Sequence, residues 1–139
     1  MKRPIAVLLM AFALVACTQG NVFSIEQGDC FNDEGDMNDQ ISSVPIVECS
    51  EPHDNEVYAV FEMTESEFPG FDVTADMADN QCLPEFESFV GTAYADSELE
   101  FGWLIPTEES WSSGDRQIVC FLFRLDLGKM TGTMEDSGI

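Results

Sequence analysis

The segment Gln117–Leu125, QIVCFLFRL, is apolar on both alternating faces until Arg124. A strand with one face in water alternates apolar and polar residues, whereas a strand buried on both faces is a continuous apolar run. The segment therefore predicts the central, most buried strand of a sheet. The residues from 128 onward, GKMTGTMEDSGI, have no periodicity and predict a flexible tail.

Three further segments have the composition of strands that could pair with this central one. They are Val44–Cys49, Glu56–Met63 and Phe101–Ile105. The second of them alternates, which predicts two faces. These faces are Val57, Ala59, Phe61 and Met63 on one side, and Tyr58 and Val60 on the other.

Apolar residues recur at steps of three and four after the turn signal Phe68-Pro69-Gly70, which predicts an amphipathic helix. They are Ala75, Ala78, Cys82, Phe86 and Phe89. Gly91 is a plausible stop. Because proline removes a helical hydrogen bond, Pro84 predicts a kink or restart near Cys82–Pro84. A short second helix is expected after Pro106, with Thr107 as its N-cap.

The cysteine count indicates an exported domain. Setting Cys17 aside, Cys30, Cys49, Cys82 and Cys120 are an even set, which predicts two disulfides. Three pairings are possible, and we favour Cys30–Cys49 with Cys82–Cys120, because the first closes a local loop and the second ties a helix to a strand. Four-cysteine zinc is the alternative, but it lacks any CxxC pair. The predicted fold class is α+β: a small antiparallel sheet of about four strands, one main helix, one short helix and two disulfides.

The N-terminus predicts a lipoprotein signal peptide over residues 1–16. Lys2 and Arg3 precede the apolar run Ile5–Leu14, and Leu14-Val15-Ala16-Cys17 has the pattern of a bacterial lipobox. Cleavage before Cys17 would leave a diacylglycerol on its sulfur, and further acyl chains such as palmitate would hold the protein to a membrane surface without spanning it. The alternative is an ordinary signal peptide or an uncleaved anchor.

Acidic residues dominate the chain. Loss of Lys2 and Arg3 with residues 1–16 would leave 3 basic and 27 acidic residues, a formal charge of −24. Such a surface repels phosphate backbones, so we expect no nucleic-acid partner. A soluble face in a salty medium explains the charge, and binding of cations or of a basic partner is the alternative.

No combination of residues predicts catalysis. Ser50, His53 and Asp54 have the residue types of a triad, but groups so close in sequence rarely converge, and there is no GxSxG elbow. We therefore expect a protein that is not an enzyme and has no cofactor. Asp29, Asp33 and Asp36 are weak candidates for calcium, since the EF-hand spacing fails. Arg116 opens the buried strand and is expected to form an ion pair or a fork onto loop carbonyls, reaching Glu51 or Asp54.

The spacing of these motifs resembles a known family. The matching positions are Gly28-Asp29-Cys30-Phe31, the run from Val44 to Tyr58 (VPIVECSEPHDNEVY), Cys82, Phe86, Val90-Gly91, Pro106-Thr107, Trp111, Gly114-Asp115-Arg116 and Val119-Cys120. Over residues 28–123 the chain is similar to the septum-formation domain of actinobacterial exported proteins. The resemblance implies a lipoprotein or single-span protein whose domain lies outside the cell, with a role in the septum or envelope. His53, Asp54, Arg116 and Trp111 fall on motif positions and are expected to be structural.

The expected organisation is a signal peptide at 1–16, a lipidated tether at 17–27, a septum-formation-like domain at 28–127 and a flexible tail at 128–139. We expect a lipid-anchored, extracytoplasmic protein of the cell membrane that binds an envelope or division protein. The alternatives are a calcium-stabilised binding domain, or a ligand-binding or hydrolytic module acting on envelope polymers. A polymer-binding module predicts a cleft lined by Trp103, Trp111 or Tyr58 beside exposed carboxylates.

Overall fold

A computed structural model describes the chain over residues 19–21, 25–33 and 43–139. The predicted signal peptide, Cys17 and Asp36 lie outside these residues, as does part of the predicted tether. None of the described helices is long and apolar enough to cross a bilayer.

One antiparallel sheet forms the centre of the protein, in the order β1-β3-β2-β4-β6-β5. Its strands are β1 (Gln19–Asn21), β2 (Cys30–Phe31), β3 (Ser43–Val47), β4 (Asn55–Glu62), β5 (Leu99–Leu104) and β6 (Gln117–Arg124). The four predicted strands correspond to β3, β4, β5 and β6. The short strand β2 lies between β3 and β4, and β1 adds an edge strand beside β3. The α+β class is confirmed, with one main helix, α1 (Phe71–Val90), and one short helix, α2 (Glu108–Ser112).

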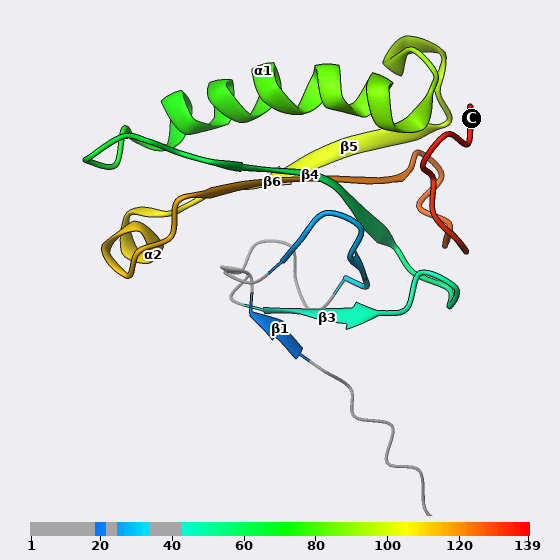
Figure 1. Ribbon diagram of the computed structural model, residues 1–139, viewed down its shortest axis with the longest axis horizontal. Helices are drawn as coiled ribbons and strands as arrows, with labels where there is room; N and C mark the ends of the chain where they lie inside the picture. The colour runs from blue at the N-terminus through cyan, green and yellow to red at the C-terminus, as the bar shows by residue number, and fades with distance from the viewer. Residues whose placement is uncertain (1–18, 22–24, 34–42) are drawn as a thin grey trace, which may run out of the picture.

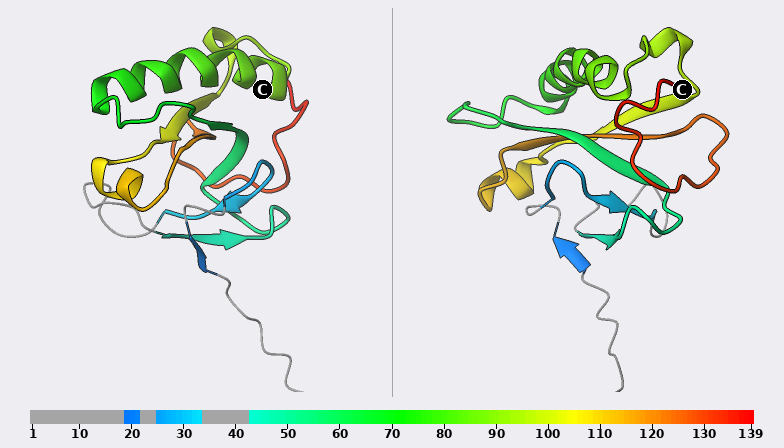
Figure 2. Two further views of the ribbon diagram at one scale, coloured as in Figure 1. Left: turned by 60° about the vertical axis from the view of Figure 1, so that its left-hand side comes forward. Right: turned by 45° about the vertical axis from the view of Figure 1, so that its right-hand side comes forward.

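Strand β6 is an interior strand, as its apolar run predicts, and it pairs with β4 on one side and β5 on the other. One face, with Ile118, Cys120 and Leu122, belongs to the main apolar cluster under α1. The other face, with Val119 and Phe121, belongs to a second cluster that includes side chains of β2 and β3. Figures 1 and 2 show α1 above strands β4, β5 and β6, and the part of the curled sheet that holds β1 and β3 below them. Both faces of β6 are covered, which explains the continuous apolar sequence.

Helix α1 is continuous through Pro84, so the predicted restart is wrong. The buried residues recur every four positions and are Thr74, Ala78, Cys82, Phe86 and Val90. Pro84 and Asn80, whose carbonyl loses its helical donor, are both exposed. Because water can serve that carbonyl, the proline costs less here than on a buried face. Gly91 ends the helix in the left-handed conformation, with φ of 80°.

A β-bulge in β4 overturns the predicted assignment of faces. The register with β6 shifts between Val57 and Ala59. Tyr58 and Ala59 therefore both join the main cluster under α1, whereas Val57 and Val60 join the second cluster. The extra residue breaks the strict alternation on which the prediction depended.

Both predicted disulfides are present, Cys30–Cys49 and Cys82–Cys120. The first links β2 to the turn after β3, and the second links the middle of α1 to β6. The predicted N-cap of the short helix is also confirmed, because the Thr107 hydroxyl accepts the N–H of Ser110 at 3.1 Å.

The C-terminal segment, predicted to be a flexible tail, instead runs back along the domain in this structure. Met130 forms an antiparallel bridge with His53 and is 4 % exposed. The N–H groups of Asp136 and Gly138 donate to the carbonyls of Phe89 and Val90, at 2.8 Å each, so the chain ends beside the C-terminal end of α1 (Figure 1). Backbone groups make these contacts, which is why no side-chain periodicity accompanies them.

We expect Tyr58 to make the fold sensitive to alkali. Its hydroxyl donates to the Cys82 carbonyl at 3.0 Å, and burial, followed by the charges of Glu85 and Tyr94, raises the pKa of Tyr58 above its ordinary value of 10.0. Below pH 10, Tyr58 keeps its proton in the folded and in the unfolded chain, so its ionisation does not reduce the free energy of unfolding. Above that pH, only the unfolded chain releases the proton, and the free energy of unfolding should fall by about 1.4 kcal/mol per pH unit. Urea unfolding from pH 9 to 11 measures this slope.

Tyr58→Phe should remove the contribution of Tyr58 to the fall of unfolding free energy with pH. The contribution of Tyr94 should remain, since a hydrogen bond to Glu100 raises the pKa of Tyr94 to about 12. A Tyr58→Phe variant with the wild-type slope would contradict the assignment.

Candidate functional site

His53, the only histidine in the chain, lies in the loop before β4 and is fully buried. Its Nδ1 lies 2.8 Å from the Glu51 carbonyl, so Nδ1 carries the proton that is donated there. Its backbone N–H and carbonyl both pair with Met130, at 3.0 and 2.8 Å. The ring is held too rigidly, and too far from solvent, to serve as a freely accessible base.

Asp54 binds a cation from the C-terminal segment. Its Oδ1 accepts Lys129 Nζ at 2.7 Å, and its Oδ2 accepts the N–H of Asp33 at 3.1 Å. Burial raises the pKa of Asp54, but the Lys129 hydrogen bond, the Asp33 N–H and the Lys129 charge outweigh it and hold the pKa below its usual range. Asp54 therefore does not pair with Arg116, contrary to one part of the prediction.

Arg116 forms the predicted fork onto loop carbonyls. Its Nη1 donates to the carbonyls of Trp111 at 2.8 Å and Asp115 at 2.6 Å. The guanidinium carbon also lies 3.6 Å from the centroid of a Trp111 ring, which adds a cation–π contact. This arrangement closes the turn between α2 and β6, so Arg116 and Trp111 hold structural positions.

The aromatic side chains proposed for a polymer cleft are engaged in packing. Trp111 and Tyr58 are 7 % and 1 % exposed. Trp103 is half-buried, and its Nε1–H donates to Asp79 of α1 at 2.8 Å. Of the three rings, only Trp103 lines a groove that also has carboxylates in its lining, those of Asp33 and Asp54, and Trp111 and Tyr58 take no part in it.

The calcium candidates that the structure describes do not converge. Asp29 accepts the N–H of Glu26 at 2.9 Å, and Asp33 accepts the side-chain amide of Asn55 at 2.8 Å. Within the described ranges, the metal-type donor atoms that do converge belong to Cys30, His53 and Glu56, all buried and all within 4.8 Å of one another. Sequence reasoning placed Glu56 only at the start of a half-buried strand and did not connect it with His53.

A groove of about 520 Å³ lies along β5 and β6, with Phe31, Leu104 and Phe121 of its lining on the sheet face opposite α1. Its lining is mainly aromatic and aliphatic, and it includes the carboxylates of Asp33 and Asp54 and the guanidinium of Arg124. The residues are Phe31, Asp33, Asp54, Asn55, Phe101, Gly102, Trp103, Leu104, Phe121, Phe123, Arg124, Leu127 and Gly128. A Cβ at position 102 would stand 2.6 Å from the Phe121 ring, so only glycine lets that ring lie across β5. The glycine within a predicted strand and the alternating Phe121 and Phe123 were the available signals for this groove, which sequence reasoning missed.

Comparison with known proteins gives one positive result. No curated protein and no solved structure matches the chain. The model of a family described as Septum formation matches residues 11–120, which span β1 to the first half of β6, both disulfides and the His53 loop. The chain therefore belongs to the Septum formation family.

Proposed function

We propose that the protein is a non-enzymatic interaction module, anchored through lipid on Cys17 to the extracytoplasmic face of the cell membrane. Family membership indicates a role related to the septum or the envelope. The lipobox and the two disulfides support an exported location, because disulfides persist in oxidising compartments. The observation that carries the binding role is the apolar groove along β5 and β6.

The groove supports binding of a partner chain with apolar side chains. Leu127, one of its lining residues, is 80 % exposed, and Phe121 and Phe123 are half-buried. Contiguous apolar surface of this kind on a soluble domain commonly marks an interaction site. The partner would therefore bury side chains that this protein leaves in contact with water.

Charge supports a cationic partner. The three cations outside the predicted signal peptide are all engaged within the described residues. Arg116 packs on Trp111, Arg124 pairs with Asp126 at 2.9 Å, and Lys129 pairs with Asp54 at 2.7 Å. The remaining surface is strongly acidic, which favours association with a basic surface and disfavours polyanionic wall polymers.

Hydrolysis of an envelope polymer has less support. A glycoside hydrolase needs one carboxylic acid that keeps its proton near neutral pH. The groove carboxylates Asp33 and Asp54 accept structural hydrogen bonds, and the pKa of Asp54 is lowered, the direction opposite to that of a general acid.

The proposal predicts that Leu127→Asp abolishes function at normal abundance. The side chain is 80 % exposed, so the change should leave the fold intact while placing a charge in the groove. In a deletion strain, Leu127→Asp should fail to restore normal division. A photo-cross-linking residue at position 127 should capture a basic envelope protein, and Cys17→Ser should abolish that capture by releasing the protein from the membrane or leaving its signal uncleaved.

The matched control is Leu125→Asp, because Leu125 is 59 % exposed and is not among the groove residues. It should complement fully, and a cross-linker at 125 should not capture the same partner. Full complementation by Leu127→Asp, or equal capture from both positions, would refute the groove as the binding surface. If the Cys17→Ser variant stays membrane-bound and functional, the lipid anchor is refuted, but the groove as a binding surface is not.

A further inference from the structure

Three side chains with metal-binding atoms meet in the interior between β2 and β4. Cys30 and Glu56 are register partners across these two strands, and His53 lies in the loop that leads into β4. Their Sγ, carboxylate and ring nitrogen atoms lie within 4.8 Å of one another. Cys30 and His53 are 0 % exposed and Glu56 is 1 % exposed. The proposed function uses none of these groups.

His53 is oriented as metal-binding histidines are. Nδ1–H donates to the Glu51 carbonyl, so Nε2 of the neutral ring has a free lone pair. Nε2 is buried and has no hydrogen-bond partner among the described residues. A buried polar atom without a partner is costly and needs an explanation. Histidines that bind metals typically donate their other ring N–H to a backbone carbonyl, which is the arrangement seen here.

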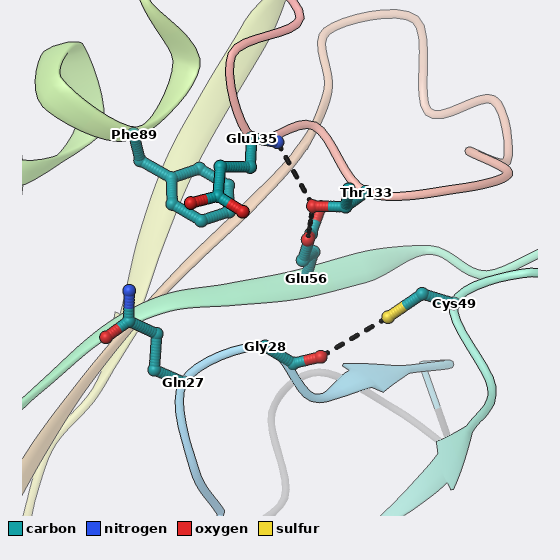
Figure 3. Close-up of a pocket in the computed structure, with 7 residues that line it drawn as sticks. All are labelled: Gln27, Gly28, Cys49, Glu56, Phe89, Thr133 and Glu135. Atoms are coloured by element: carbon teal, nitrogen blue, oxygen red, sulfur yellow. Dashed lines mark hydrogen bonds between the residues drawn. The ribbon is translucent and has the colours of Figure 1, made fainter.

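Glu56 is held in place by the C-terminal segment. Its Oε1 accepts the hydroxyl of Thr133, and its Oε2 accepts the N–H of Met134 at 2.7 Å. Figure 3 shows Glu56 and Thr133 facing each other on one side of a cavity, with Cys49 nearby. Hydrogen-bonded carboxylates of this kind are pre-organised ligands, since each oxygen retains a second lone pair.

The third metal-binding atom, the sulfur of Cys30, is oxidised in the Cys30–Cys49 disulfide. We propose that reduction of this disulfide creates a binding site for a zinc-class divalent ion, with Cys30, His53 and Glu56 as ligands and the adjacent Cys49 sulfur as a fourth. An external dithiol supplies two electrons and two protons, becomes a disulfide itself, and leaves two thiols on the protein. The metal then displaces the protons of the thiols that bind it. Sulfur, imidazole and carboxylate in a set of four match the preference of zinc.

The two disulfides differ in how easily a reductant can reach them. Cys49 is half-buried and lines a cavity of about 340 Å³ that Glu56 also lines, whereas Cys82 and Cys120 are both 0 % exposed. A small reductant or a metal ion can approach through this cavity, so Cys30–Cys49 should be reduced first.

The purified full chain in detergent tests the proposal with cobalt(II) as the probe. After mild reduction without oxygen, it should bind one cobalt per chain and develop the intense visible bands of a tetrahedral site together with thiolate-to-cobalt charge transfer. The oxidised protein should show neither signal. Thiolate charge transfer separates this site from non-specific binding to the acidic surface, which supplies only oxygen ligands. Zinc should displace the cobalt and raise the melting temperature of the reduced protein only.

Two variants and a matched control locate the ligands. His53→Gln and Glu56→Gln should weaken cobalt binding by at least ~10-fold, because each removes one ligand. Glu51→Gln should bind as the wild type does, since only the backbone carbonyl of Glu51 contacts His53. If His53→Gln does not fold, the cobalt spectrum of the reduced wild type tests the proposal by itself. A reduced wild type without thiolate charge transfer, or a folded His53→Gln with unchanged affinity, would overturn the proposal.

Discussion

A chain that ends at Leu127 is expected to lose about 5 kcal/mol or more of unfolding free energy, although the removed residues have no periodic sequence. Truncation takes away both donors to the buried carboxylate of Glu56, the hydroxyl of Thr133 and the N–H of Met134. It also removes Met130, which is 4 % exposed. A hydrogen bond to a charged group contributes about 1.5–3 kcal/mol, and burial of a methionine contributes a similar amount. Urea unfolding followed by tryptophan fluorescence measures the loss.

Single substitutions separate this mechanism from a general effect of shortening the chain. Thr133→Val removes one donor to Glu56 and should cost about 1–3 kcal/mol, because a buried carboxylate loses a partner. Ser137→Ala lies in the same exposed stretch and should change stability by less than about 0.5 kcal/mol. If the truncated chain were as stable as the full chain, the segment would not be held by these contacts, and the flexible tail predicted from the sequence would be the better description.

The features that the sequence predicted are those in which local chemistry decides the outcome. The apolar run of β6 follows from burial on both faces, and the helical stripe of α1 follows from burial on one face. The sequence allowed three cysteine pairings, and the observed one was favoured because it closes a local loop and ties the helix to the central strand. The fork of Arg116 followed from its place beside a glycine turn at the start of a buried strand.

The features that sequence reasoning missed depend on contacts between distant backbone segments. The bulge in β4 adds one residue to an otherwise regular alternation, and no residue type at Tyr58 marks it. The ion pair of Asp54 with Lys129 spans 75 positions and depends on how the C-terminal segment returns to the domain. The approach of His53 to Glu56 was missed because these residues lie three apart, a spacing that leaves their relative direction open in a loop. The bulge and the ion pair are thus decided by the backbone or by groups far apart in sequence, whereas the His53–Glu56 approach is decided by the loop conformation.

The second large effect is expected from removing the Cys82–Cys120 disulfide. Replacing both residues with alanine should lower the unfolding free energy by about 4 kcal/mol, since the bridge closes a loop with a sequence separation of 38. The corresponding change at Cys30–Cys49, with a separation of 19, should cost about 3 kcal/mol. The chain-entropy account places most of this effect in the unfolded state, which gains conformations when the link is removed.

Circular dichroism and urea unfolding of the variant together test whether the effect lies in the unfolded state. The near-ultraviolet circular dichroism of the alanine pair should stay close to that of the wild type, because the neighbours of the bridge, among them Tyr58 and Phe86, keep their packing. The dependence of unfolding free energy on urea should become steeper, because an unlinked chain exposes more surface when it unfolds. A loss of stability with an unchanged slope and altered dichroism would instead place the effect in the native core. Cys82 lies two residues before Pro84, where α1 lacks one hydrogen bond, so the link to β6 would then be holding the helix together at its weakest turn.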